Sequence, residues 1–242
     1  MKKRVSILNC SSYDHPLVRE TVLQCINHLG GIEKFVSRGE RILVKPNLLM
    51  RREPGQVTTT HPAIVLSVCE ILKEAGCSII IADSPGGPYN EARLRSVYRT
   101  TGMEEVAEKV GAKLNFDTSS VEVETKEGCL LKRLTLLAPF REVDKVISIS
   151  KLKSHALTQF TGGVKNLFGM IPGIQKMEYH LKMADTSAFC NVLVDTCVTV
   201  NPVLSVMDAV EAMDGQGPAS GRKKHVGAVI ASSSPYHLDA VA

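Results

Sequence analysis

Tryptophan is absent from this chain of 242 residues, and other aromatic residues are few, with six phenylalanines and five tyrosines. A platform on which nucleic-acid bases stack needs several such rings, so the sequence supplies one poorly. The excess of positive charge is also small, because the chain has 29 lysines and arginines and 25 aspartates and glutamates. We therefore expect no nucleic-acid partner.

Long hydrophobic runs are lacking as well. The longest are far too short to cross a bilayer, which takes about 20 apolar residues. The start, Met1-Lys2-Lys3-Arg4, has the charge of a signal peptide, but polar residues return directly after Val5-Ser6-Ile7-Leu8. These absences predict a soluble, cytoplasmic protein without a membrane partner.

Paired cysteine motifs are missing too. The seven cysteines are odd in number, lie far apart in the sequence and never form CxxC. This spacing excludes a zinc knuckle and a cluster-binding run, and it is typical of free, buried thiols. We therefore predict no metal ligands in this chain. Protein purified without oxygen should be colourless, and stoichiometric iron and sulfide would contradict this.

The residues that are present predict an α/β fold. With 44% apolar and 22% charged residues, residues 1–242 can bury the core of one large domain. Short apolar runs are typical of strands at 5–9, 41–45, 78–82, 146–150, 204–207 and 226–231. Helical spacing predicts helices over 14–26, 60–75 (capped by Thr60), 90–111 (two helices broken near Gly102), 186–200 and 235–242. This order predicts a mostly parallel, Rossmann-like sheet with helices on both faces.

Residues 121–137 depart from that alternation. Two runs of alternating apolar and polar residues flank the turn at Lys126-Glu127-Gly128, which predicts an antiparallel hairpin inserted into the domain. The last helix runs to Ala242 with no capping residue after it. We therefore expect the natural protein to continue, and this chain to be a fragment of it.

Polar side chains follow four of the predicted strands. Ligands of an open parallel sheet bind at the carboxyl ends of its strands, so these side chains are expected to converge. The segments that follow the strands are Lys45-Pro46-Asn47, Asp83-Ser84-Pro85-Gly86-Gly87, Lys151-Leu152-Lys153-Ser154-His155 and Asp208. The alternative is that each merely begins a surface loop.

Two glycine-rich segments point to an anion. The segment 161–169, Thr-Gly-Gly-Val-Lys-Asn-Leu-Phe-Gly, offers backbone N–H groups, the Thr161 hydroxyl and the Lys165 ammonium. Neither it nor the segment 83–88 has the spacing of a Walker A or GxGxxG motif. The alternative for each is a tight turn that needs glycine. If segment 162–169 binds an anion, Lys165→Met should weaken that binding about tenfold or more.

Histidine supplies the candidate for proton transfer. His155 lies near Lys151 and Lys153, whose charges favour its neutral form. We predict His155, Asp83 and Asp208 as catalytic residues. The residues predicted to bind the ligand are Lys45, Asn47, His61, Ser84, Gly86, Gly87, Lys151, Lys153, Thr161, Gly162, Gly163, Lys165 and Asn166. No HExxH, GxSxG or Cys–His arrangement indicates a metal site or an ordinary hydrolase.

Several segments together resemble the DUF362 family over nearly the whole chain. The most specific are Ser150-Lys151-Leu152-Lys153-Ser154-His155 and Gly163-Val164-Lys165-Asn166-Leu167-Phe168-Gly169. The others, in chain order, are 44–48, 58–62, 82–86, 208–213, 215–218 and 238–242. Many members of that family are described as iron–sulfur proteins with a ferredoxin-like region, which the resemblance implies for the missing C-terminal part of the parent protein, with a [4Fe–4S] cluster and a redox partner. The layout also resembles the N-terminal domain of lactate-racemase-type proteins.

Three functions follow from these observations. The first is an enzyme domain, such as an oxidoreductase, that binds a small anionic metabolite (a carboxylate or phosphate) at the carboxyl edge of the sheet. The second is a non-catalytic electron-transfer or assembly module that docks a protein partner on the same surface. The third, a nucleotide-binding domain, lacks the expected phosphate-binding motifs. A ligand in the cleft favours the enzyme domain.

Overall fold

One mixed sheet forms the centre of the molecule. The computed structural model describes residues 4–182 and 185–242, so the first three residues of the charged N-terminal run lie outside the described part. The strands lie in the order β1-β10-β9-β7-β2-β3-β4, and β8 pairs with β7. Their bounds are β1 (Val5–Asn9), β2 (Arg41–Pro46), β3 (Ser78–Ile81), β4 (Lys113–Leu114), β7 (Lys145–His155), β8 (Gln159–Thr161), β9 (Leu204–Asp214) and β10 (Arg222–Ser232).

Parallel pairing dominates this sheet. Strands β9, β7, β2, β3 and β4 are parallel neighbours in that order. Strand β10 is antiparallel to both β9 and β1, and β8 is antiparallel to β7. The prediction of a mostly parallel sheet is thus confirmed, with the antiparallel pairs at one side of it and at the end of β7.

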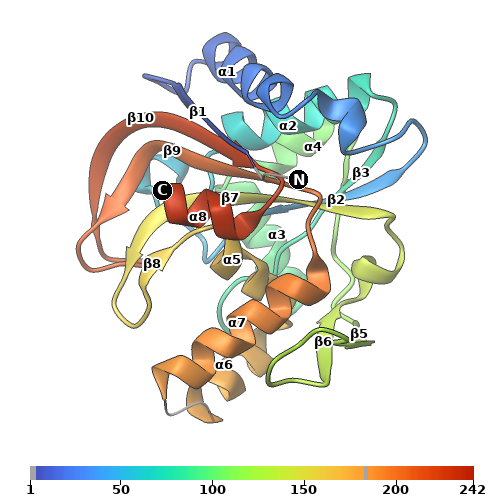
Figure 1. The fold of residues 1–242 in the computed structure, drawn as a ribbon, viewed down its shortest axis with the longest axis vertical. Coiled ribbons are helices and arrows are strands. Elements are labelled where there is room, and N and C mark those ends of the chain that lie inside the picture. Colours follow the sequence, from blue (N-terminus) through green and yellow to red (C-terminus); the bar gives the residue numbers. More distant parts are fainter. Residues whose placement is uncertain (1–3, 183–184) are drawn as a thin grey trace.

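Helices pack on both faces of the sheet (Figure 1). On one face, α1 to α4 bury their apolar residues against the sheet in the larger core. On the other face, α7 and the turn after α5 form a second core, and α8 packs against β9 and β10. The helices are α1 (His15–His28), α2 (Pro62–Glu74), α3 (Glu91–Thr100), α4 (Met103–Val110), α5 (Gly163–Asn166), α6 (Gly173–Lys182), α7 (Thr186–Val200) and α8 (Pro235–Val241).

An antiparallel hairpin stands apart from the main sheet. Its strands are β5 (Ser120–Glu124) and β6 (Arg133–Leu137), which lie at the predicted place. The buried carboxylate of Asp195, on α7, accepts hydrogen bonds from the backbone N–H groups of Cys129, Leu130 and Leu131 at 2.6–2.8 Å. One helix side chain therefore fixes the segment that connects the two hairpin strands.

Three local predictions were wrong. Strand β7 continues to His155 and β9 to Asp214, so Lys151, Lys153 and Asp208 lie within strands and not after them. Pairing with β8 and β10 extends these strands past their apolar segments. The cap of α2 is His61, whose side chain accepts the Ala63 N–H, because the Thr60 hydroxyl is already bonded to Asn47 N–H and Ile149 C=O.

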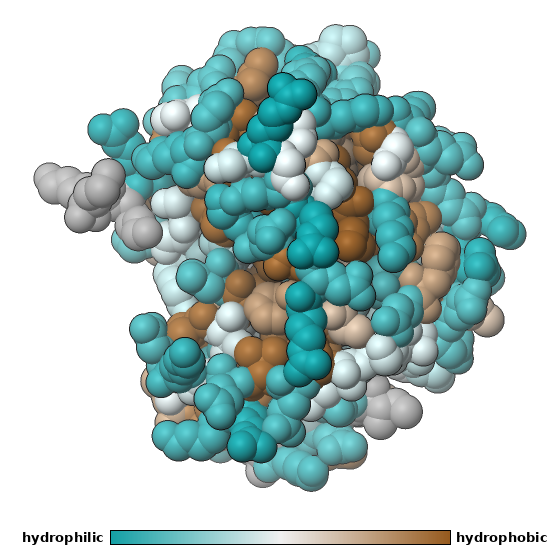
Figure 2. Space-filling model, turned by 90° about the vertical axis from the view of Figure 1, so that its right-hand side faces the viewer, coloured by the Kyte–Doolittle hydropathy of each residue, from teal (hydrophilic) through white to brown (hydrophobic). Residues whose placement is uncertain are grey.

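The surface is mostly hydrophilic on the face drawn in Figure 2, and hydrophobic side chains show between the polar ones toward its middle. Large exposed hydrophobic side chains come from several elements, among them Met177 and Leu181 on α6 and Tyr236 and Val241 on α8. None of the described helices is long and apolar enough to span a bilayer.

Candidate functional site

Strand β7 carries two lysines whose side chains are buried, Lys151 and Lys153. Lys151 and Lys153 alternate with Leu152, so both lie on the same side of the strand, and they are 0% and 1% exposed, whereas Leu152 is only half-buried. Buried ammonium groups need hydrogen-bond partners, because burial removes the water that would solvate them. The partners of these two lysines differ, and they divide the polar residues into two groups.

The first group lines a cavity of about 230 Å³ near the carboxyl ends of β2 and β3. Eleven of the sixteen predicted site residues line it: Lys45, Asn47, Asp83, Ser84, Gly86, Gly87, Lys153, His155, Thr161, Lys165 and Asn166. The structure therefore brings together residues from segments that lie far apart in the sequence. The other five, His61, Lys151, Gly162, Gly163 and Asp208, lie outside this lining.

Lys45 and Asp83 form an ion pair of 2.9 Å at the floor of the cavity. Lys45 Nζ also donates to Pro46 C=O and Asn166 Oδ1, while Asp83 accepts the N–H groups of Leu48 and Ser84. Burial lowers the pKa of Lys45, and the Asp83 carboxylate opposes that shift. Both charges are thus saturated by partners within the protein, which leaves Asp83 poorly suited to accept a substrate proton.

Gly169 makes room for this pair. A Cβ atom at position 169 would lie 2.1 Å from Asp83 Oδ1 and 2.5 Å from Lys45 Nζ, closer than any side chain permits. Gly169, the last residue of the predicted anion-binding segment 161–169, therefore allows that segment to lie close to the ion pair.

Asn166 links the two sides of the cavity. Its Oδ1 accepts from Lys45 Nζ and Asn47 Nδ2, and its Nδ2 donates to Lys45 C=O and Ser148 Oγ. Asn47 Oδ1 in turn accepts from Lys153 Nζ at 2.9 Å. A continuous network therefore joins Lys45 to Lys153 through two amides, and it holds these side chains in fixed orientations.

Three lysines of the cavity have only uncharged partners among the described residues. Lys153 donates to Asn47 Oδ1 and Thr58 C=O, Lys165 to Thr158 Oγ1, and Lys176 to the carbonyls of Ser84 and Pro85. Burial and neighbouring lysines lower the pKa of Lys153 to about 7. Burial lowers the pKa of Lys165 to about 7 and that of Lys176 to about 8.

Two hydroxyl groups of the cavity lining also lack a hydrogen-bond partner in the described part of the chain. Ser84 Oγ and Thr161 Oγ1 are buried and have no hydrogen-bond partner among the described residues. Buried polar groups in folded proteins are nearly always hydrogen-bonded, so such hydroxyls call for a further partner. They lie on the same cavity as the three lysines.

His155 is oriented by its own loop. Its Nδ1 accepts the backbone N–H groups of Leu157 and Thr158 at 3.1 and 3.2 Å. Because an N–H can only donate, Nδ1 carries no hydrogen, and the neutral ring has its hydrogen on Nε2. His155 can thus donate a hydrogen bond from Nε2, whereas the predicted role as a base needs a free ring nitrogen.

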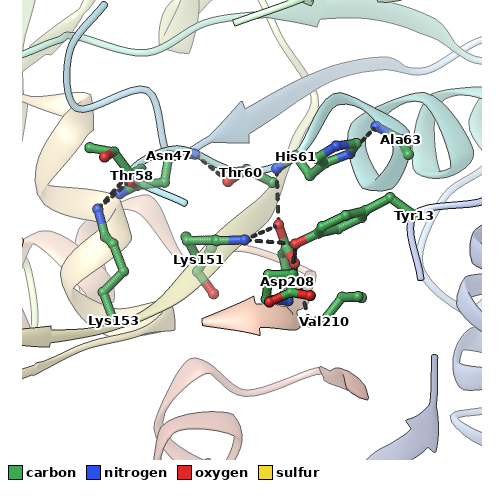
Figure 3. Close-up of polar contacts among 12 residues, drawn as sticks. Tyr13, Asn47, Thr58, Thr60, His61, Ala63, Lys151, Lys153, Asp208 and Val210 are labelled. Carbon is green, nitrogen blue, oxygen red and sulfur yellow. Dashed lines mark hydrogen bonds and ion pairs between the residues drawn. The ribbon is translucent and has the colours of Figure 1, made fainter. Parts of the chain in front are cut away.

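A second polar group surrounds Asp208, beside the cavity (Figure 3). Lys151 Nζ lies 2.9 Å from Asp208 Oδ2, and both side chains are fully buried. The Tyr13 hydroxyl donates to Asp208 Oδ1 and accepts from Lys151, and the His61 N–H donates to the same carboxylate. Lys45, Asp83, His155 and Asp208 were all expected to converge at the carboxyl edge of the sheet. Lys45, Asp83 and His155 line the cavity, whereas Asp208 does not.

His61 stacks on Tyr13, with ring centroids 3.6 Å apart and planes inclined by 7°. Its Nδ1 accepts the Ala63 N–H, and burial lowers its pKa to about 4. A neutral, stacked ring that caps α2 has a structural role in this group. The family motif Thr-Thr-His-Pro thus joins the start of α2 to strand β9 through Asp208.

The predicted anion loop holds a carboxylate of this chain. The backbone N–H groups of Gly163 and Val164 donate to Asp239, on α8, at 2.5 and 2.9 Å. Burial raises the pKa of Asp239 to about 6, although these two N–H groups oppose the shift. The backbone donors of this loop are therefore engaged by Asp239, while the Lys165 ammonium and the Thr161 hydroxyl of the same loop line the cavity.

Several residues of the two polar groups could not be found from the sequence. Lys176 and Met177 line the cavity from α6, a helix that was not predicted. Tyr13 follows β1 without any motif around it. Asp239 does stand in a family-like segment, 238–242, and that resemblance was the one signal that could have found it.

Cysteine donors do not gather in this structure. Among the described residues, no three His, Cys, Asp or Glu side chains lie close enough together to hold a metal ion. Five cysteines are buried, Cys190 is half-buried and Cys129 is exposed. A [4Fe–4S] cluster needs about four thiolate ligands, so the described residues do not fit such a cluster.

The fold and the lysine-lined cavity define an α/β protein with a polar site at the carboxyl edge of a mostly parallel sheet. The model of the family described as "Domain of unknown function (DUF362)" matches residues 42–242, and the chain belongs to this family. The chain is 33% identical over 250 residues to the thylakoid-associated protein sll1697 of Synechocystis sp.. That alignment covers 100% of this chain and 74% of the relative.

The fold is similar to that of an enzyme whose structure has been solved. The lactate racemase apoprotein from Thermoanaerobacterium thermosaccharolyticum matches with a TM-score of 0.54 and 14% identity, over 96% of this chain. The chain spans 55% of that protein's length. At this identity the match concerns the fold alone, and it confirms the predicted likeness of layout.

Proposed function

We propose that the cavity binds a small anionic metabolite, a carboxylate or a phosphate. The observation that carries this proposal is the set of three lysines, Lys153, Lys165 and Lys176, which line one cavity without a carboxylate partner among the described residues. The one carboxylate in the lining, Asp83, is already paired with Lys45. An anion would supply the missing countercharge.

The uncharged groups of the cavity support the same ligand. The hydroxyls of Ser84 and Thr161, which have no partner among the described residues, can donate to anionic oxygens. A volume of about 230 Å³ suits a metabolite of a few heavy atoms and is small for a nucleotide. The donors and the size thus favour a small anion over the nucleotide alternative.

A lysine is the group of this cavity best suited to transfer a proton. Asp83 and Asp208 are each held by an ammonium group and by backbone N–H groups, and neutral His155 presents a hydrogen donor. A lysine whose pKa is about 7 can accept and return a proton near neutral pH. The [4Fe–4S] cluster implied by the family resemblance, the redox partner and the cytoplasmic location stay predictions.

The test is a calorimetric titration with inorganic phosphate and with acetate at pH 6.5. Lys165→Met keeps much of the side-chain volume and removes the charge, so the affinity for the anion should fall about tenfold or more, because a charged hydrogen bond contributes about 1.5–3 kcal/mol. The matched control is Lys73→Met, which removes an exposed lysine of α2 on the other face of the sheet and should leave the affinity unchanged. Equal affinity in wild type and Lys165→Met, or no binding by the wild type, would contradict the proposal.

A further inference from the structure

The amine of Lys153 has an unusual set of partners. An ammonium group has three N–H donors, whereas a neutral amine has two N–H donors and one lone pair. Lys153 Nζ is 2.9 Å from Asn47 Oδ1 and 2.8 Å from Thr58 C=O, and both acceptors are uncharged. Two acceptors match the two hydrogens of the neutral amine and leave its lone pair unused.

The two other buried lysines of these strands provide an internal comparison. Lys45 Nζ has three acceptors, one of them the Asp83 carboxylate, as an ammonium group requires. Lys151 Nζ contacts the Asp208 carboxylate and the Tyr13 hydroxyl. Lys153 is equally buried but has no carboxylate beside it among the described residues. The surroundings of Lys153 on β7 therefore favour the uncharged amine.

Neighbouring charges act in the same direction. Burial is the largest cause that lowers the pKa of Lys153 to about 7; the charges of Lys151, Lys165 and Lys45 add to it, and the Asp83 carboxylate opposes it. An ordinary lysine with a pKa near 10.4 is almost wholly protonated at neutral pH. Desolvated lysines near other cations are the ones that act as amine nucleophiles.

We propose that Lys153 is a nucleophile that forms a Schiff base with a small carbonyl compound carrying an anionic group, such as a 2-oxo acid. This inference rests on the proposed function, because the anionic group would be bound by the charged and hydroxyl donors of the same cavity. The carboxylate of a 2-oxo acid lies next to its carbonyl carbon. Contacts from Lys165 or Thr161 to that carboxylate would hold the carbonyl inside the cavity that Lys153 lines.

The chemical step balances without an oxidant or reductant. The lone pair of Lys153 Nζ attacks the carbonyl carbon, a C–N bond forms, and the carbonyl oxygen takes up a proton to give a carbinolamine. The C–O bond then breaks and the oxygen leaves as water, which carries away the two hydrogens of the amine. The product is a C=N bond between Lys153 and the substrate carbon.

Reductive trapping tests this step. The wild-type chain is incubated at pH 7 with pyruvate and sodium cyanoborohydride, which reduces the C=N bond to a stable amine, and the product is analysed by intact mass and peptide mapping. We expect one dominant adduct, at Lys153, formed at least about tenfold faster than at exposed lysines, whose pKa is about 3 units higher. Inorganic phosphate should slow the reaction by competition.

Variants and a parallel measurement separate the outcomes. Lys153→Arg keeps a cation and should abolish the adduct, and Lys73→Met should not change it. Labelling spread over surface lysines, or a dominant adduct at Lys165 or Lys176, would overturn the inference. Phosphate binding is measured by calorimetry on the same preparation, so that binding without an adduct overturns the Schiff base and leaves the proposed function standing. Neither binding nor an adduct would overturn both.

Discussion

Five buried or half-buried lysines at the sheet edge, and the exposed Lys73 used as a control, differ mainly in the groups that surround their side-chain nitrogens. Lys45 and Lys151 each lie 2.9 Å from a buried carboxylate, and such pairs hold strands together at the expense of desolvation. Lys153, Lys165 and Lys176 contact only uncharged oxygens in the described part of the chain. Lys73, exposed on α2, is an ordinary solvated lysine. Residue type alone does not separate structural lysines from the ones available to a ligand, because the partners come from distant segments.

The lowered lysine pKa values predict how stability changes with pH. The unfolded chain keeps a lysine protonated up to about pH 10.4, whereas folded Lys153 loses its proton near pH 7. Between these values the unfolded state binds more protons, so the free energy of unfolding rises as the pH increases. From pH 6.5 to 8 one such group contributes about 1 kcal/mol.

Urea denaturation without added anion measures this effect. The wild type should gain stability from pH 6.5 to 8, and the gain should be smaller by about 1 kcal/mol in Lys153→Met. Because both proteins have the same cysteines, which begin to ionise in the unfolded chain near pH 8, the comparison cancels that contribution. Parallel pH curves for the two proteins would show that Lys153 titrates normally.

At the scale of elements, the alternation of apolar runs predicted most of the architecture. Helix α7 was predicted with its observed bounds, 186–200, and its end was indicated by Asn201-Pro202. The break between α3 and α4 falls at Gly102, whose φ of 76° lies in the left-handed region that glycine favours. These signals are local, so the sequence alone contains them.

The ends of β7 and β9 could not be predicted in the same way. Polar residues such as Lys151 and Asp208 normally mark the end of a buried strand, but here each satisfies the other across neighbouring strands. The short elements β4, β8, α5 and α6 also escaped prediction, since pairing and packing stabilise them more than their own sequences do. The site residues at the carboxyl ends of β2 and β3, such as Asn47 and Asp83, were predicted from the sequence. Lys176 was missed, because its helix, α6, was not predicted.

The hairpin provides a prediction at this scale. Asp195→Ala removes an acceptor of three backbone N–H groups in the segment that joins β5 and β6. The free energy of unfolding should fall by about 2–4 kcal/mol, since charged hydrogen bonds are lost while the exposed N–H groups regain water. Hydrogen exchange should increase over residues 120–137. Asp185→Asn, at the cap of the same helix, should change little because asparagine caps equally well, and unchanged exchange in Asp195→Ala would contradict the role of Asp195.

At the scale of the whole molecule, the fold places the cavity where an open parallel sheet binds its ligands. Segments from β2, β3, β7 and α5 meet there, and Asp239 of α8 holds the start of α5 through the backbone N–H groups of Gly163 and Val164. The match to the DUF362 model and the likeness to the lactate racemase fold agree with this α/β layout. The proposed function rests on the side chains of the cavity, because a shared fold by itself does not determine chemistry.

The central claim is that an anion occupies the lysine-lined cavity, and a crystal grown with selenate tests it most directly. Selenate resembles phosphate in shape and charge, and its selenium is located by anomalous scattering. The account predicts a peak in the cavity whose oxygens lie within about 3 Å of Lys165 Nζ and of the Ser84 or Thr161 hydroxyl, which are otherwise unpartnered or held by a single neutral acceptor. The peak should be lost in Lys165→Met crystals. A wild-type crystal with selenate only at surface positions, and none in the cavity, would contradict the account.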